Sequence, residues 1–238
     1  MSTRSNLEEK PPQRIEKMSV SENITRIQST LPEGVRLVAV SKFHPVEALR
    51  EAYDAGQRLF GESRVQELVA KMPHMPSDVS WHFIGHLQRN KVRPLIGNVA
   101  LIESVDSLRL LETIDRLSEE SGVVTSVLMQ VHVAAEETKF GFSTEELVDY
   151  FSSRGYENLR ATHICGIMGM ATNTDDEKRV RADFAAIRRC FDEIRAVSPD
   201  LRGFDVISMG MSDDYRIAIE EGSNLVRVGS AIFGQRQY

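Results

Sequence analysis

The chain has 238 residues, with 29 basic and 35 acidic side chains and a formal net charge of −6. This acidic balance argues against a nucleic-acid groove or an anionic membrane surface as the main partner. No apolar run approaches the ~20 residues that span a bilayer, and the first 20 residues contain no apolar signal core. The two cysteines form neither a disulfide framework nor a metal motif, so we expect a cytoplasmic protein.

The first part of the chain is polar and differs in composition from the remainder. Residues 1–14 contain a Pro-Pro pair and predict a flexible tail. The next stretch, 15–31, predicts a first helix that ends before Pro32 and Gly34. The predicted organisation is therefore a tail, 1–14, and then one folded domain, 15–238.

Short β-branched runs then alternate with longer amphipathic stretches up to the C-terminus. The predicted strands are 36–40, 58–61, 81–85, 99–104, 126–133, 161–167, 205–210 and 225–229. The predicted helices are 45–55, 63–72, 88–96, 107–121, 143–153, 175–197 and 213–221. Ser143 with Glu146 three residues later, and Asp106 before a leucine-rich stretch, are the expected N-caps of two of these helices.

Eight such alternations predict an α/β protein, a single (β/α)8 TIM barrel with an extra N-terminal helix and a flexible tail. The alternative is an open doubly wound sheet. That fold needs more helix on both faces, and no Gly-x-Gly-x-x-Gly turn follows the first predicted strand. We therefore favour the barrel.

A lysine ends the first predicted strand, in the sequence VRLVAVSK, and shares its strand face with Val38 and Val40. Burying an unpaired ammonium group is expensive, so Lys42 should reach water or have a chemical role. Because barrels place their chemistry at the C-terminal ends of the strands, we expect the Lys42 amine at the mouth of the barrel.

The segments after the seventh and eighth predicted strands, ISMGMSDDY and VRVGSAIFG, are rich in small residues. Barrels commonly bind phosphate with these two loops. Ser208 offers a hydroxyl, and the amides of Gly229 and Ser230 are expected to face an anion. Ser212 is expected to cap the helix that begins near Asp213. Together the two loops predict a phosphate site.

Arg227 lies between these loops and is predicted to point into the barrel, where a guanidinium needs an acceptor. The acceptor is either Glu62 or another rim carboxylate, in a structural ion pair, or an atom of a ligand. An amine, a phosphate site and an inward arginine together predict pyridoxal 5′-phosphate, bound to Lys42 as a Schiff base.

The remaining candidates near the mouth are histidines and methionines. His82 and His86 share a strand face but have no third ligand at useful spacing, so no metal site is predicted. His86 is expected to form hydrogen bonds at the rim. The methionines, Met209 among them, are expected to fill gaps around the cavity.

Six segments between Val35 and Gly234 resemble the pyridoxal-phosphate homeostasis proteins, also called the YggS or proline synthase co-transcribed family. They are AVSKFHP, FGESRVQEL, WHFIGHLQRNK, EETKFGF, ISMGMSDDY and VRVGSAIFG. The resemblance implies a barrel like the N-terminal domain of alanine racemase, with the cofactor on Lys42. It further implies that Ser208, Gly229 and Ser230 hold the phosphate, and that Arg227 faces the pyridine nitrogen.

The chain departs from the family at two positions that bear on ring contacts. Ser63 stands where the family often has asparagine, and so does His132 at the end of the fifth predicted strand. Serine and histidine also donate hydrogen bonds, and we keep Ser63 among the expected cofactor-binding residues.

An arginine at the pyridine nitrogen donates a hydrogen bond and leaves that nitrogen unprotonated, which makes the ring a weak electron sink. Alanine racemase also uses an arginine, but it has a second base from another domain, and this chain ends a few residues after the eighth strand. The expected function is therefore that of a monomeric, non-enzymatic protein that holds or buffers pyridoxal phosphate and takes part in vitamin B6 and amino- and keto-acid homeostasis. Vitamin B6 vitamers are its expected partners, with amino acids and apo-enzyme acceptors as further candidates.

Two other functions remain open. One is that of a slow pyridoxal-phosphate-dependent enzyme that acts on amino acids, as a racemase does. The other is that of an aldolase-like barrel, in which Lys42 attacks the carbonyl of a sugar phosphate directly.

Overall fold

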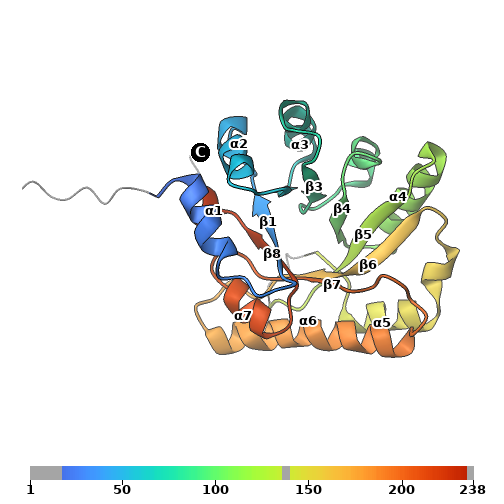
Figure 1. Ribbon diagram of the computed structural model, residues 1–238. Coiled ribbons are helices and arrows are strands. Elements are labelled where there is room, and N and C mark those ends of the chain that lie inside the picture. The colour runs from blue at the N-terminus through green and yellow to red at the C-terminus, as the bar shows by residue number, and fades with distance from the viewer. Residues whose placement is uncertain (1–17, 136–139, 235–238) are drawn as a thin grey trace, which may run out of the picture.

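The computed structural model describes residues 18–135 and 140–234 (Figure 1). Eight parallel strands pair in sequential order, and β8 pairs with β1 to close the barrel. The strands are β1 (Arg36–Val40), β2 (Leu59–Glu62), β3 (Ser80–Phe83), β4 (Leu101–Val105), β5 (Thr125–Val131), β6 (Thr162–Gly169), β7 (Val206–Ser208) and β8 (Leu225–Val228). The predicted (β/α)8 barrel is confirmed.

Amphipathic helices surround the barrel and bury their apolar faces against it. They are α1 (Val20–Gln28), α2 (Val46–Asp54), α3 (Val65–Lys71), α4 (Leu108–Ser121), α5 (Thr144–Ser152), α6 (Glu177–Val197), α7 (Tyr215–Glu220) and α8 (Ser230–Phe233). Four short 3-10 helices join them: η1 (Met72–His74), η2 (Arg89–Lys91), η3 (Arg93–Leu95) and η4 (Gly155–Asn158). None of the helices in the described ranges is long and apolar enough to cross a membrane.

The helix predicted at 88–96 is wrong, because η2 and η3 occupy this connection instead of an α-helix. Pro94 lies in the first turn of η3, and proline has no N–H to continue an α-helical ladder. The apolar residues Val92 and Leu95 are nevertheless buried, as an amphipathic pattern requires.

The predicted caps have mixed outcomes. Ser143 forms a capping box with Glu146 at the start of α5, as expected. Asp106 does not cap α4, because Ser107 occupies the N-cap position and the Asp106 carboxylate binds His86 Nδ1 at 2.9 Å. The first helix is shorter than predicted within the described residues. It begins at Val20 after a Ser19 cap, while the predicted tail and 15–17 lie outside the described range.

The core has two parts, as the alternation of strand side chains requires. A large apolar layer fills the space between barrel and helices, and a small apolar cluster fills part of the barrel interior. The interior cluster comprises Val38, Leu101, Leu128, Met168, Val206 and Leu225. Two positions further along β4, β7 and β8, on the same strand faces, lie the buried polar residues Glu103, Ser208 and Arg227. The interior therefore becomes polar toward the C-terminal ends of the strands.

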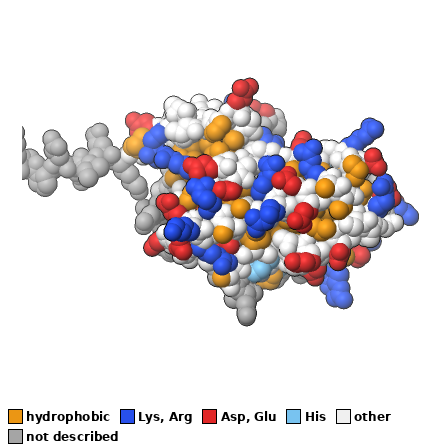
Figure 2. Space-filling view, turned by 90° about the horizontal axis from the view of Figure 1, so that it is seen from below, with side chains coloured by type: hydrophobic (Ala, Val, Ile, Leu, Met, Phe, Trp, Pro, Cys, Tyr) orange, Lys and Arg blue, Asp and Glu red, His pale blue; other side chains and the backbone are white. Residues whose placement is uncertain are grey.

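The outer surface around α6 is solvated and carries both signs of charge (Figure 2). Arg181 of α6 pairs with Glu220 and Glu221 at 2.6 and 2.7 Å, and Arg188 pairs with Asp192 at 2.8 Å. Exposed pairs of this kind contribute little to stability but keep the surface polar.

Helix α1 precedes the first strand and packs on the barrel next to α8, from the other end of the chain (Figure 1). Ile24 and Ile27 are its buried residues. The Asn23 side chain donates to the backbone carbonyl of Ile232 at 3.0 Å. The extra helix thereby fixes the C-terminal α8 beside the barrel mouth.

Gly166 sits where the register between β5 and β6 shifts, and it adopts φ +156°. A Cβ at this position would lie 1.8 Å from the backbone oxygen of Val206 on the next strand. The Gly166→Ala variant should therefore lose about 3 kcal/mol of unfolding free energy, measured by denaturant titration. Gly34→Ala is the matched control, because Gly34 has φ +86° but open space around its Cβ position. The control should lose about 1 kcal/mol, and equal losses for the two variants would contradict the steric explanation.

Candidate functional site

A cavity of about 250 Å³ opens at the C-terminal ends of the strands, and we call it the Lys42 cavity. Its lining residues are Val40, Lys42, Ser63, Ile84, Met170, Met211, Ser212, Asp213, Arg227, Gly229 and Ser230. Five of the eight residues expected to bind the cofactor are thus brought together: Lys42, Ser63, Arg227, Gly229 and Ser230. The other three, Ser208, Met209 and His86, do not line the cavity.

Lys42 lies just beyond the strand on which the sequence placed it. Strand β1 ends at Val40, so Lys42 belongs to the connection to α2 rather than to the strand itself. Its neighbour Phe43 has φ 67°, a left-handed conformation that is unusual for a bulky residue. Such a conformation persists only where the surrounding contacts determine it.

A buried polar cluster around Lys71 holds the backbone on both sides of Lys42. The Lys71 ammonium donates to the Ser41 carbonyl oxygen at 2.8 Å and to Glu62 Oε1 at 2.7 Å. It also donates to Glu67 Oε1 at 2.6 Å, and this same oxygen accepts the backbone N–H of Phe43 at 2.6 Å. The residues before and after Lys42 are therefore both fixed to the Lys71 cluster.

The sequence alone did not predict the Lys71 cluster. Burial raises the pKa of Glu62, and the hydrogen bond and charge of Lys71 offset only part of that effect. Glu62 binds Lys71 and the Ser41 hydroxyl, so it is not the ion-pair partner that the sequence suggested for Arg227. The signal available in the sequence was the Glu67–Lys71 spacing, an i,i+4 pair on one helix face.

Arg227 is 4% exposed and lies beneath the Lys42 cavity. Its guanidinium donates to the Ser208 hydroxyl and to the Gly169 carbonyl oxygen, the latter at 3.0 Å. The Ser208 hydroxyl in turn donates to Glu103 Oε2 at 2.5 Å. Glu103 Oε2 is also 3.7 Å from the guanidinium, so the carboxylate that pairs with Arg227 is Glu103.

Glu103 is fully buried and joins the interior network of four side chains. His82 Nδ1 lies 2.6 Å from its Oε1, and Ser208 and Arg227 contact its Oε2. Burial alone would raise the pKa of Glu103, but the hydrogen bond and charge of His82, the charge of Arg227 and the Ser208 hydrogen bond together lower it. Burial lowers the pKa of Arg227, and the charges of Glu103 and Asp214, which raise it, offset only part of that effect. The network therefore keeps a carboxylate directly beside the cavity's guanidinium.

The expected phosphate loops meet at Ser212. Its hydroxyl oxygen accepts the backbone N–H groups of Gly229 at 3.1 Å and of Ala231 at 3.5 Å. The expectation that Ser212 caps α7 is wrong, because Asp214 occupies that N-cap position. Ser212 instead joins the loop after β7 to the loop after β8, and both loops border the Lys42 cavity.

The other expected site residues have structural environments of their own. His86 stacks on Phe140 with ring centroids 3.8 Å apart, in addition to its bond to Asp106. Met209 is fully buried in the layer between barrel and helices. The lining residues that sequence reasoning did not single out for cofactor binding are Val40, Ile84, Met170, Met211, Ser212 and Asp213. In the described parts of the chain, no group of three or more His, Cys, Asp or Glu side chains is placed to hold a metal ion.

Replacing Glu103 by glutamine should leave the Arg227 guanidinium buried without its carboxylate. We expect a loss of about 3–5 kcal/mol of unfolding free energy at neutral pH, measured by denaturant titration. Because folding lowers the pKa of Glu103, its stabilisation is complete above the ordinary value of 4.5 and is lost as pH falls through the folded value. The difference between wild type and variant should therefore shrink in acid. Glu112→Gln, at an exposed position of α4, is the control, and a difference independent of pH would contradict the assignment.

Comparisons with known proteins agree with this geometry. The chain matches the family model described as "Alanine racemase, N-terminal domain" over residues 15–237. A pyridoxal phosphate homeostasis protein of Helicobacter pylori is 40% identical over 203 residues, which cover 84% of this chain and 87% of the relative.

Solved structures resemble the chain to different degrees. PipY of Synechococcus elongatus PCC7942 with PLP bound is 37% identical, with a TM-score of 0.84 over 91% of this chain and 100% of that one. An alanine racemase from E. faecalis shares the fold alone, at 20% identity and a TM-score of 0.68, over 91% of this chain and 57% of that one. The family expected from the sequence motifs is confirmed: the chain belongs to the pyridoxal phosphate homeostasis proteins, within the alanine racemase N-terminal domain family.

Proposed function

We propose that this protein binds pyridoxal 5′-phosphate through Lys42 and holds it as a store of the vitamer, without a defined catalytic turnover. The observation that carries the proposal is the placement of Lys42, Arg227 and the Gly229–Ser230 turn around one cavity of about 250 Å³. The names of the relatives and the PLP bound to PipY support the same ligand.

The residues of the Lys42 cavity fit the parts of this vitamer. Lys42 would hold the vitamer through its amine, as a Schiff base with the aldehyde. The Ser212 and Ser230 hydroxyls, with the backbone N–H of Ser230, supply donors for the phosphate group. The methionines at positions 170 and 211, together with Ile84, offer apolar surface for the ring.

The contacts of Arg227 favour storage of the vitamer over catalysis. Its guanidinium is held by Glu103 and Ser208, and it donates to whatever ring atom it meets. A donor at the pyridine nitrogen leaves that nitrogen without a proton, so the bound ring stabilises carbanions poorly. The Ser208 hydroxyl donates to Glu103 and accepts from Arg227, and we assign it to orienting the guanidinium rather than to the phosphate.

In this proposal the protein is a monomer that works in the cytoplasm. It exchanges vitamin B6 vitamers with its surroundings and passes pyridoxal 5′-phosphate to apo-enzymes. The amount of bound pyridoxal 5′-phosphate responds to amino acids. A slow racemase-like enzyme is the second candidate, favoured by the fold shared with alanine racemase. A sugar-phosphate aldolase is the third, and it would be colourless when purified.

The first prediction concerns the lysine. Lys42→Ala should abolish the visible absorption band of the loaded protein and the mass added by borohydride reduction, because among the described residues that line the cavity Lys42 is the only one with a side-chain amine. Lys178→Ala, at an exposed position of α6, should keep both signals. A Lys42→Ala protein that retains the band would overturn the assignment.

The second prediction separates the phosphate contacts from the aldehyde contact. Ser230→Ala should weaken the binding of pyridoxal 5′-phosphate by about tenfold and leave pyridoxal nearly unaffected, since a hydrogen bond to a charged group contributes about 1.5–3 kcal/mol. Dissociation constants for the two ligands, measured by absorbance titration, test this. Equal losses for both ligands would place the phosphate elsewhere.

The third prediction concerns turnover. Mixing the loaded protein with single amino acids should change its spectrum without rapid racemisation or release of keto acid, because the ring is a weak electron sink. Chiral chromatography and keto-acid assays measure these products directly. Fast formation of either product would support the enzyme function instead.

A further inference from the structure

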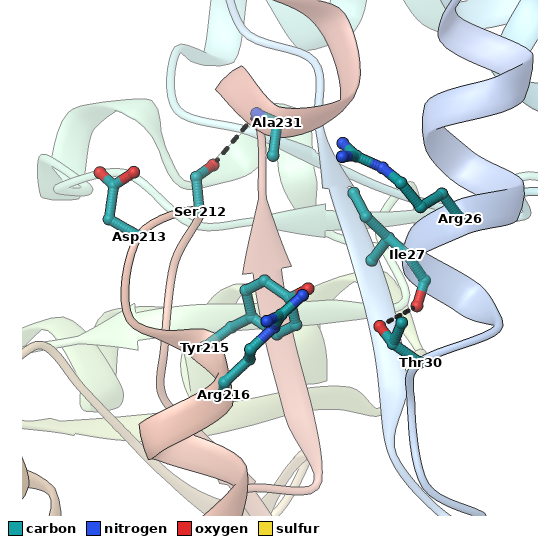
Figure 3. Close-up of a pocket in the computed structure, with 8 residues that line it drawn as sticks. All are labelled: Arg26, Ile27, Thr30, Ser212, Asp213, Tyr215, Arg216 and Ala231. Carbon is teal, nitrogen blue, oxygen red and sulfur yellow. Dashed lines mark hydrogen bonds between the residues drawn. The ribbon is translucent and has the colours of Figure 1, made fainter.

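A second cavity, of about 310 Å³, lies next to the Lys42 cavity, between α1, α7 and α8 (Figure 3). We call it the Arg26–Arg216 cavity, after the two arginines that line it. Ser212 and Asp213 line both cavities, so only the loop after β7 and the start of α8 separate them.

The charge at this second cavity is positive. Arg26 comes from α1 and Arg216 from α7, and the Asp213 carboxylate points away from both side chains (Figure 3). Within residues 18–135 and 140–234, neither guanidinium forms an ion pair with a carboxylate. Arg26 donates to the Asn23 side chain at 3.2 Å, a neutral acceptor that leaves its charge uncompensated.

Both arginines also act on Tyr215, which lines the same cavity. Burial alone would raise the pKa of this phenol, but hydrogen bonds with Arg216 and Thr30 and the charges of Arg216 and Arg26 together lower it. A lowered phenol pKa means that this space favours negative charge. Arg216 also lies over the Tyr215 ring, 5.9 Å from its centroid, which limits the positions of its guanidinium.

Ser212 adds a neutral donor to the two charged ones. Its oxygen accepts two backbone N–H groups, those of Gly229 and Ala231, and its own proton remains available to donate. The Thr30 hydroxyl is different, because it donates to the Ile27 carbonyl oxygen at 2.8 Å (Figure 3). Among the described residues that line the cavity, these donors are therefore two guanidiniums and one hydroxyl, and the one carboxylate, that of Asp213, points away from the arginines (Figure 3).

We propose that the Arg26–Arg216 cavity binds a phosphate group, as a second anion site beside the Lys42 cavity. Two guanidiniums offer planar, paired donors that suit the oxygens of a phosphate, and a tetrahedral dianion has enough acceptors for all three side chains. The phosphate belongs either to inorganic phosphate or to the ester of a second vitamer. Its donors other than Ser212 lie outside the Lys42 cavity, so occupation of that cavity removes at most the Ser212 contribution to the second site.

The test uses protein whose Lys42 cavity is already filled. The full chain is loaded with pyridoxal 5′-phosphate, reduced with borohydride and checked by mass, and inorganic phosphate is then titrated by calorimetry at constant ionic strength. One phosphate should bind per chain. The double variant Arg26→Gln/Arg216→Gln should bind it at least about tenfold more weakly.

The control is Arg109→Gln, at an exposed position of α4 with no lining role in either cavity. It should bind phosphate as the wild type does. Absence of phosphate binding to the wild type, or equal binding by the double variant, would overturn the proposal. If the mass shows no loading of Lys42, the same titration on the unloaded protein tests the second site separately from the proposed function.

A parallel titration with pyridoxine 5′-phosphate, which has no aldehyde, identifies the source of the phosphate. Binding at least tenfold tighter than that of inorganic phosphate, and lost in the double variant, assigns the site to a vitamer. Equal affinities, again lost in the double variant, assign it to inorganic phosphate. Binding of either probe that the double variant retains counts against the site.

Discussion

The pairing of Glu103 with Arg227 inside the barrel is the interaction on which the site depends. A parallel barrel normally fills its interior with apolar side chains, and the apolar cluster around Leu101 and Leu225 follows that pattern. Two residues further along the strands the interior holds opposite charges. Buried charges are tolerated only when they are paired and hydrogen-bonded, and here His82 and Ser208 complete the pairing. The guanidinium is thereby presented to the cavity in one fixed orientation.

The turn that carries Lys42 is held by contacts outside the barrel, whereas Arg227 is held by contacts inside it. The Lys71 cluster reaches it from β2 and α3, outside the barrel, and holds the residues on both sides of the lysine. Arg227 is held from inside the barrel and Lys42 from outside it, so the two networks share no residue. Each side of the cavity therefore has its own support.

The sequence was sufficient for the fold because strand periodicity and the strand–helix alternation are local signals. The first strand was predicted over 36–40, as β1 is, although Lys42, expected at its end, lies two residues beyond it. Strand parity correctly placed Arg227 inside the barrel. The odd or even position of a residue along a strand gives the face of the sheet on which its side chain lies. It does not give the partner of that side chain, because the partner depends on the register between neighbouring strands. For this reason Glu62 was considered for Arg227, whereas the carboxylate of β4 lies within reach.

The same limit explains the other differences. Ser208 was expected to bind phosphate, but it is fully buried, does not line the Lys42 cavity, and donates to Glu103. The irregular connection at 88–96 has helical periodicity, yet Pro94 interrupts the backbone bonds that an α-helix needs. A pattern of apolar residues alone does not distinguish a continuous helix from two short turns that bury the same side chains.

The position of Ser212 between the two cavities has a thermodynamic consequence. A hydroxyl has one proton, so it donates to an anion on one side at the expense of the other. Occupancy on either side then lowers affinity on the opposite side, and linkage requires the two reductions to be the same factor. If both proposed sites hold phosphate groups, the barrel should release its bound vitamer more readily when phosphate is abundant, which is negative cooperativity within one polypeptide and requires no movement of its backbone.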